Sequence, residues 1–434
     1  MFHVKQIWER IRALSIDELF FYLFVFTIPF QLRTVLNPAN AYIGYYFSYH
    51  LAIFFYLSDL IFIGFLSAFV LYDKTSKRKL WPIVLPILWS IINVFHVEHF
   101  DLWLYGTLKI AEFWLIVAYL VHRPKTVKPV LIILIICGLI QALIATLQFH
   151  VQHGLGLGFL GEYIPGILDS GAATINTGLG KILRAYGTMA HPNVLGGFLT
   201  LCYAALLYVS RETYKFNEWL IVSCGTFLLF GGILVSFSRS AWLAVGLVST
   251  FWFIYLIYKV SMKRGLIFAV IVIVSCGTLG LIYQKPLFYR IIQNSDTNQA
   301  IEYRADFNGY ALDLIQVHTI TGLGAGQYIP WLTETKQLEP WQYQPPHNVL
   351  LMYLTEMGAV GLIIALYTVF RLGFTWNNLN MFNLIFITAL VVMGALDHYL
   401  LTIQTGFLTL AIILSVVISN KKDVSQLRET SLEE

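Results

Sequence analysis

The stretch VKPVLIILIICGLIQALIATLQF, residues 127–149, decides the class of fold. It contains one charged residue, Lys128, and it exceeds the roughly 20 residues of helix that cross the hydrocarbon core of a bilayer. Eleven other stretches share its apolar character. The twelve lie at residues 19–36, 50–72, 80–96, 101–121, 127–149, 190–210, 218–236, 239–258, 265–283, 347–370, 379–397 and 401–419. The sequence therefore predicts an all-α membrane protein with about twelve spanning helices.

The composition agrees with a membrane environment. Of the 434 residues, 58% are hydrophobic and only 12% are charged, which is too little charge to cover a soluble globule of this length. The four cysteines lie inside apolar runs, so they are expected to be core residues and not a disulfide framework or a zinc site. They are Cys137, Cys202, Cys224 and Cys276.

The distribution of Lys and Arg predicts the orientation. Nineteen of the 28 lie in the two tails and in alternate connections, the asymmetry expected of cytoplasmic segments. Those connections are 73–79, 122–128, 211–217, 258–264 and 371–378. Both termini are therefore expected in the cytoplasm, with the first helix acting as an uncleaved signal anchor.

Two predicted outer loops are long, at residues 150–189 and 284–346, within what is expected to be a single membrane domain over residues 1–434. Long loops are usually functional or disordered, and the glycine and aromatic content favours ordered segments at the membrane surface. In the second loop, EYRADFNGYALDLIQ (302–316) has apolar residues at helical spacing. It predicts an amphipathic helix with Arg304 on its buried stripe, where an arginine without an anionic partner is costly.

Four outer segments carry candidate functional residues. They are RAYGTMAHPNVLGGF (184–198), SFSRSAWLA (236–244), the Arg304 helix with TGLGAGQY (321–328), and PPHNVLLMYLTEMGAVG (345–361). Arginine has a planar set of donors suited to phosphate oxygens, and a histidine near neutral pH can take a proton from a sugar hydroxyl. This combination suits glycosyl transfer from a diphosphate-linked lipid. The candidates are Arg184, Arg239 and Arg304 for the diphosphate and His347 for the general base.

Structural interpretations compete with these functional ones. Arg239 fits an interfacial anchor as well as a phosphate ligand, and His191, the rival base, fits a plain helix start before Pro and Asn. Asn348 is expected to help cap the helix that follows His347. Glu356 is expected to form a buried hydrogen bond that fixes neighbouring helices.

Charged residues inside the predicted spans are costly and are functional candidates by default. Besides Glu356 they are Asp59, Lys109, Glu112 and Asp397. Lys109 and Glu112 lie three residues apart on one helix and are expected to neutralise each other.

Neither TGLGK (177–181) nor GLGAG (322–326) has the spacing or context of a nucleotide-binding motif. The outer acidic residues lack hard-metal spacing, with Asp296, Glu302 and Asp306 as the residual doubt. The sequence therefore predicts a reaction without a metal or cofactor.

These features together resemble the O-antigen ligase and polymerase superfamily of membrane glycosyltransferases. The resemblance rests on the helix number, the large loop between the ninth and tenth helices, SRSAWLA, the arginine-bearing helix before GLGAG, and HN followed by Glu356 and Gly358. It implies a GT-C-like fold in a bacterial inner membrane and an inverting, metal-independent transfer. The implied donor is a glycan on undecaprenyl diphosphate, and the acceptor is lipid A core or another glycan.

The resemblance implies that Arg184 and Arg239 bind the donor diphosphate and that His347 activates the acceptor. Arg304 is expected to be a further residue of the donor site. The motifs do not separate a ligase from a polymerase that uses a second lipid-linked repeat unit, and the absence of an appended soluble domain mildly disfavours a protein-modifying branch. A twelve-helix transporter is the rival from another class, but the two halves show no convincing repeat. A cell-wall polymerase of the SEDS type would be expected to have about ten helices and an acidic base.

Overall fold

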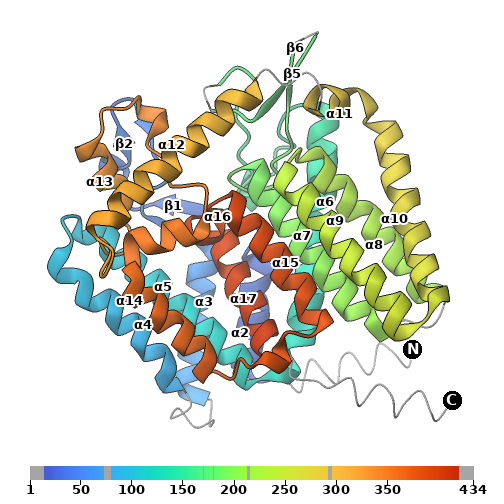
Figure 1. Ribbon diagram of the computed structural model, residues 1–434, viewed down its shortest axis with the longest axis horizontal. Coiled ribbons are helices and arrows are strands. Elements are labelled where there is room, and N and C mark those ends of the chain that lie inside the picture. Colours follow the sequence, from blue (N-terminus) through green and yellow to red (C-terminus); the bar gives the residue numbers. More distant parts are fainter. Residues whose placement is uncertain are drawn as a thin grey trace.

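Helices make up 74% of the structure, a computed structural model that describes residues 14–72, 80–169, 171–178, 180–212, 216–291 and 296–419. Each of the twelve predicted stretches contains a helix (Figure 1). They are α2 (Ile16–Thr27), α3 (Leu57–Tyr72), α4 (Trp81–Ile92), α5 (Phe100–His122), α6 (Pro124–Val151), α7 (Pro192–Val209), α8 (Phe216–Val235), α9 (Arg239–Tyr255), α10 (Met262–Ile282), α14 (Val349–Arg371), α15 (Met381–Leu396) and α17 (Gln404–Ser419).

Among the described residues, seven helices are long and apolar enough to cross a membrane: α5 to α10 and α14. Helices α3, α15, α17 and the pair of α4 with its short extension η3 (Asn93–His96) are apolar but shorter. The predicted class, an all-α membrane protein, is thus confirmed, and the count of twelve spanning helices stays a prediction. Most of the two predicted cytoplasmic tails and the connection 73–79 lie outside the described residues.

The bounds predicted for the first two spans are wrong. Helix α2 ends at Thr27 and α3 begins at Leu57, and the residues between them form short strands. Strand β1 (Arg33–Val35) pairs with β4 (Phe54–Tyr56), and β2 (Tyr42–Ile43) pairs with β3 (Tyr46–Phe47), both antiparallel. Pro29 cannot donate a backbone hydrogen bond, and the aromatic residues beyond it favour strands.

The elements of the long loops gather at one end of the helix bundle, here called the loop end (Figure 1). They are η4 (Gly158–Leu160), the antiparallel pair β5 (Thr174–Thr177) and β6 (Gly180–Leu183), α11 (Gln284–Ile291), α12 (Asp296–Val317), α13 (Tyr328–Thr335) and η7 (Pro340–Gln342). The predicted amphipathic helix is confirmed in α12, where Phe307, Ala311 and Leu314 are buried. Ala311 and Leu314 pack against residues of α13 and against Met352 of α14.

The remaining short elements are connections or breaks between helices. They are η1 (Pro38–Asn40), η5 (Ser210–Glu212), η6 (Leu256–Val260), η8 (Trp376–Asn378) and α16 (Tyr399–Thr402).

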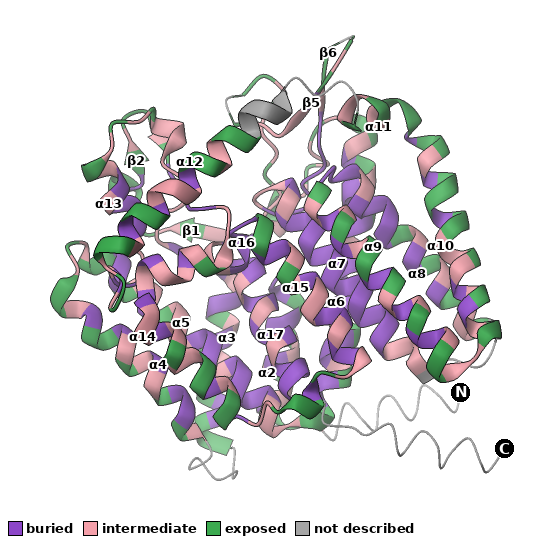
Figure 2. Ribbon diagram, in the orientation of Figure 1, coloured by how far each residue is buried: buried purple, intermediate pink, exposed green. Residues whose placement is uncertain are grey.

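Helix α7 forms the centre of the bundle and contacts α6, α8, α9, α15 and α17. In the apolar stretch of α7, 89% of the residues are buried. The corresponding share is 22% for α10, which lies at the edge of the bundle (Figure 2). Because α7 starts at the loop end, the residues just before it are held against the ends of several helices at once.

Helix α14 is broken at Gly358, which has a φ of 65°. This break is where the TGLGAGQY segment docks: Leu323 N–H donates to the Thr355 carbonyl at 3.0 Å. A Cβ on Gly358 would collide with the Ile320 carbonyl, and one on Gly322 would collide with the α14 backbone. The glycines of these two segments therefore allow two stretches of backbone to approach closely.

Candidate functional site

His347 is positioned by the start of α14. The Asn348 side chain caps this helix by accepting hydrogen bonds from the N–H groups of Leu350 (2.9 Å) and Leu351 (3.1 Å), as predicted. Its amide nitrogen donates to the Ala395 carbonyl at 3.4 Å, near the end of α15. The capping residue thus ties the start of α14 to the end of α15, which places His347 beside the residue that follows α15.

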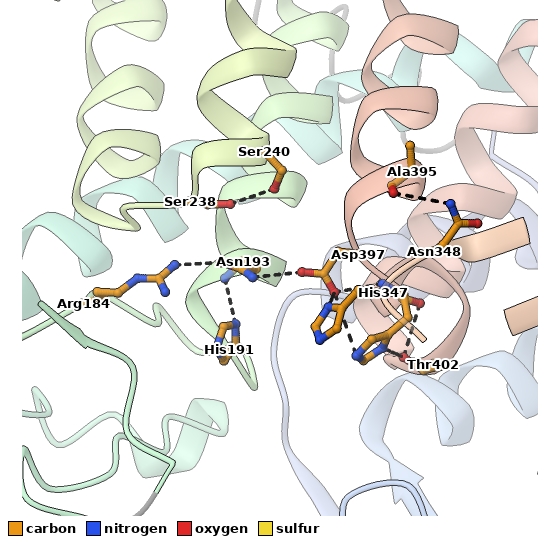
Figure 3. Close-up of polar contacts among 11 residues, drawn as sticks. Arg184, His191, Asn193, Ser238, Ser240, His347, Asn348, Ala395, Asp397 and Thr402 are labelled. Atoms are coloured by element: carbon orange, nitrogen blue, oxygen red, sulfur yellow. Dashed lines mark hydrogen bonds and ion pairs between the residues drawn. The ribbon is translucent and has the colours of Figure 1, made fainter. Parts of the chain in front are cut away.

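That residue is Asp397, in extended backbone between α15 and α16. One carboxylate oxygen accepts from the backbone N–H of His398 at 2.8 Å, and the other accepts from the Asn193 side chain at 2.9 Å. The first oxygen also lies 3.6 Å from Nδ1 of His347 (Figure 3). This distance is longer than a hydrogen bond, and the buried Nδ1 has no other partner among the described residues. The contact is therefore an ion pair when His347 is protonated.

Asp397 is held in its ionised form. Burial by itself raises the pKa of Asp397, but the histidines around it, His347 foremost, outweigh burial and hold this pKa well below its usual range. A permanently charged carboxylate thus lies beside the predicted base.

His191, the rival base, is the N-cap of α7. Its Nδ1 accepts a hydrogen bond from the backbone N–H of Asn193 at 3.1 Å. Burial, reinforced by the positive charge of Arg184, lowers the pKa of His191 to about 3. A group of such low basicity is poorly matched to proton abstraction near neutral pH, which leaves His347 as the candidate base.

Helix α12 covers His347 from the loop side. The ring of Phe307 stacks on the His347 ring, with centroids 6.0 Å apart and an interplanar angle of 28°. Arg304 precedes Phe307 by three residues, so both lie on one face of α12, and Arg304 is half-buried there. The same face of this helix therefore brings a cation and an aromatic ring to the base.

Arg184 is buried and held in a fixed orientation. Its Nε donates to the Ser236 carbonyl at 2.8 Å, and one terminal nitrogen donates to the Asn193 side chain at 2.7 Å. Because Asn193 also donates to Asp397, a continuous polar chain runs from Arg184 to the pair of Asp397 and His347 (Figure 3).

Four arginines lie near one another at the loop end. Burial lowers the pKa of Arg184 to about 9, and three nearby cations add to this effect. The cations are Arg290, Arg304 and Arg239. Arg239, the first residue of α9, is exposed. Within the described part of the chain, no carboxylate forms an ion pair with Arg184, Arg239 or Arg304, so their charge is available to an anion.

Two further histidines, His398 and His50, lie close to His347 and to each other. The ring centroid of His398 lies 5.1 Å from that of His347, and His50 lies 5.5 Å from His398. Burial lowers the pKa of His50 to about 4 and holds that of His398 well below its usual range. Both are neutral at physiological pH. Nδ1 of His398 lies 2.6 Å from the Thr402 hydroxyl.

One group of side chains among the described residues has the donor set of a metal site. The ligand atoms of His347, Asp397 and His398 lie within 4.8 Å of one another, and two imidazoles with a carboxylate suit zinc better than magnesium. The acidic residues named from the sequence do not join it. Glu302 and Asp306 are exposed, and the side chain of Asp296 is not among those that the structure describes.

Three of the charged residues named within the predicted spans form a separate cluster, whereas Asp397 lies just after the end of α15. The Lys109 ammonium donates to Asp59 at 2.6 Å and to Glu112 at 2.9 Å. The expected pairing of Lys109 with Glu112 is confirmed, and Asp59 is a third member. The Glu356 carboxylate accepts from backbone N–H groups of the loop before α13, which agrees with the expected role in fixing neighbouring segments.

Comparison with known families gives one match. Residues 224–366 match the family model described as O-antigen ligase. The matched part is about a third of the chain, and it is similar to the O-antigen ligase superfamily. The matched segment contains Arg239, Arg304 and His347, whereas Arg184 and Asp397 lie outside it. No curated protein matches the chain.

The site contains residues that the sequence did not single out. Asn193 was read only as part of a helix start, and neither His398 nor Arg290 was assigned a role. Asp397 was a candidate only because of its cost inside a membrane. The sequence did contain a signal for Asp397. Asp397 and His398 lie at the break between the last two apolar stretches, where two helices meet and polar side chains can line a site.

Proposed function

We propose that this protein is a member of the O-antigen ligase superfamily and transfers a glycan from undecaprenyl diphosphate to an acceptor hydroxyl on the extracytoplasmic face of the inner membrane. The ligase reaction, with lipid A core as acceptor, is the first choice, and polymerisation onto a second lipid-linked glycan is the alternative. One observation carries the proposal. Among the described residues, Arg184, Arg239 and Arg304 form no ion pair with a carboxylate, and they lie at the same end of the bundle as His347, which is beside the ionised Asp397.

The arginines suit a diphosphate. Each guanidinium offers fixed donors to phosphate oxygens, and several cations together offset the charge that develops on the leaving group. Arg184 is already oriented by Ser236 and Asn193, so it loses little freedom when it binds. Arg239 and Arg304 supply charge from two other elements.

The histidine suits an acceptor hydroxyl. Asp397 lies on the Nδ1 side of His347, which favours the tautomer with the proton on Nδ1 and leaves the lone pair on Nε2. His347 then takes the hydroxyl proton on Nε2, and Asp397 stabilises the imidazolium.

The acceptor oxygen bonds to the anomeric carbon of the donor sugar on the face opposite the diphosphate. The bond from that carbon to the phosphate oxygen breaks, and its electron pair leaves with the diphosphate. The transfer inverts the anomeric centre, and no step requires a metal.

The test is transfer by purified protein from undecaprenyl-diphosphate glycan, in EDTA, with lipid A core or a second lipid-linked glycan as acceptor. Product with one acceptor alone assigns the branch. We expect His347→Ala and Arg239→Ala to abolish product, and the exposed loop-end residues His153 and Lys181 to serve as matched alanine controls.

Three results would count against the proposal. Normal turnover by both His347→Ala and Arg239→Ala would show that the site is wrong. Complete loss of wild-type activity in EDTA would show that a metal takes part, with His347, Asp397 and His398 as the first candidates for its ligands. Passage of intact lipid across vesicles without glycan transfer would favour a transporter.

A further inference from the structure

A cavity of about 180 Å³ is lined in part by His50, whose ring centroid lies 5.5 Å from that of His398. The ends of α5, α14 and α17 line it, together with α16 and the strand segment before α3. Its lining includes no residue between Ile110 and Ala325, and therefore none of the helices α6 to α11 near the arginines.

The wall of the cavity passes close to the proposed base, although His347 itself does not line it. His50, Pro345 and Thr402 form part of its wall. Pro345 lies two residues before His347, and the Thr402 hydroxyl contacts His398. Arg184 and Thr402 lie on opposite sides of Asp397 and His347 (Figure 3). The proposed base therefore has Arg184 on one side and a residue of the cavity wall on the other.

The chemistry of the lining is aromatic and polar without excess positive charge. Four tyrosines line the cavity: Tyr49, Tyr56, Tyr105 and Tyr353. Lys109 also lines it, but Asp59 and Glu112 hold its ammonium at 2.6 Å and 2.9 Å, and Glu356 adds a further carboxylate. Such a surface disfavours phosphate, which the arginine side favours.

The same surface is suited to a sugar. Tyrosine rings present apolar faces with a polar edge, which match the carbon faces of a pyranose. Carboxylates accept hydrogen bonds from hydroxyl groups, and the Lys109 ammonium has three donors of which two are used. The cavity is smaller than the roughly 300–1,000 Å³ of pockets that enclose a whole ligand, so it suits one sugar unit.

We propose that this cavity binds the terminal sugar of the acceptor and presents one of its hydroxyls to Nε2 of His347. The inference rests on the proposed function and assigns the two substrates to opposite sides of His347. The diphosphate of the donor lies on the arginine side, and the acceptor sugar lies between the tyrosines and Glu356.

The experiment compares two variants of the cavity wall with one control. Tyr105→Ala removes an aromatic face, Ile110→Phe fills space, and Tyr45→Ala changes a loop-end tyrosine that is 82% exposed and outside the lining. Each protein is assayed with whichever of lipid A core and lipid-linked glycan supports wild-type transfer. The assay gives KM for acceptor, KM for donor and the rate of donor hydrolysis by water. Binding of lipid A core and of the lipid-linked glycan without a donor is measured by thermophoresis, and thermal unfolding checks the fold.

We expect both cavity variants to raise the acceptor KM and weaken acceptor binding by about tenfold, Tyr105→Ala because it loses one good aromatic contact and Ile110→Phe because its ring occupies the space of the sugar. The donor KM and donor hydrolysis should stay at wild-type values, as should every value for Tyr45→Ala. Equal changes in donor and acceptor KM, or unchanged acceptor binding in both folded variants, would overturn the acceptor assignment. Absence of transfer by the wild type with either acceptor would instead refute the proposed function.

Discussion

Replacing Asp397 with Asn tests whether a fixed negative charge beside His347 drives proton abstraction. The change keeps the size of the side chain and one acceptor oxygen. It removes the charge that lies 3.6 Å from Nδ1 of His347. Helix packing around α15 and α16 should persist, because Asn can still accept from either Asn193 or His398.

The size of the effect follows from the distance. Two unit charges 3.6 Å apart attract by about 4–5 kcal/mol at an effective dielectric constant of about 20. This attraction exists only once His347 has taken the proton, so its loss falls on the transition state. At about 1.4 kcal/mol per factor of ten, kcat should fall by about 10³-fold. One of the two hydrogen bonds to Asp397 is also lost, which costs about 1–3 kcal/mol of stability.

The assay is single-turnover transfer from undecaprenyl-diphosphate glycan under saturating acceptor, with thermal unfolding measured in parallel. Asp101→Asn, at an exposed acidic residue in the first turn of α5, is the matched control and should keep wild-type kcat. If Asp397→Asn retained kcat within about tenfold of wild type while remaining folded, the charge of Asp397 would not act on the base.

Three further predictions follow from other parts of the structure. Arg184→Gln should lower both Tm and activity, because it removes two charge-assisted hydrogen bonds worth about 1.5–3 kcal/mol each. Arg239→Gln, at an exposed residue, should raise the donor KM and leave Tm unchanged, and an equal fall in Tm for both variants would contradict this contrast. Three histidines have lowered pKa values in the folded protein, so the unfolded state binds more protons below about pH 6.5. They are His50, His191 and His398. Stability present above that pH should be lost as pH falls toward about 4, by up to about 1.4 kcal/mol per pH unit for each histidine, and a flat Tm between pH 7 and pH 5 would refute it. Gly358→Ala should lower Tm strongly because its Cβ meets the Ile320 carbonyl at a φ of 65°, whereas Gly309→Ala, in open space, should not.

The predicted helices were correct where a long apolar stretch, or apolar residues at helical spacing on one face, indicates them. Residues 127–149 form a helix because a run of apolar side chains needs no partner far away in the chain. The Arg304 and Phe307 face of α12 and the cap at Asn348 also follow from spacing within a few residues. The bounds of the first two spans were mispredicted because the residues between α2 and α3 form strands. These strands depend on pairing between Arg33–Val35 and Phe54–Tyr56, which hydropathy does not report.

The sequence by itself determined the membrane class, the approximate positions of the long apolar helices and the arginine and histidine residues available at the loop end. Only the tertiary structure placed Asp397 beside His347 and linked it through Asn193, 204 residues away, to Arg184. The difference has a physical cause. Hydropathy and capping act between residues that are close in the chain, whereas a polar site forms where helix ends from distant segments are packed together and must satisfy one another's charges and hydrogen bonds.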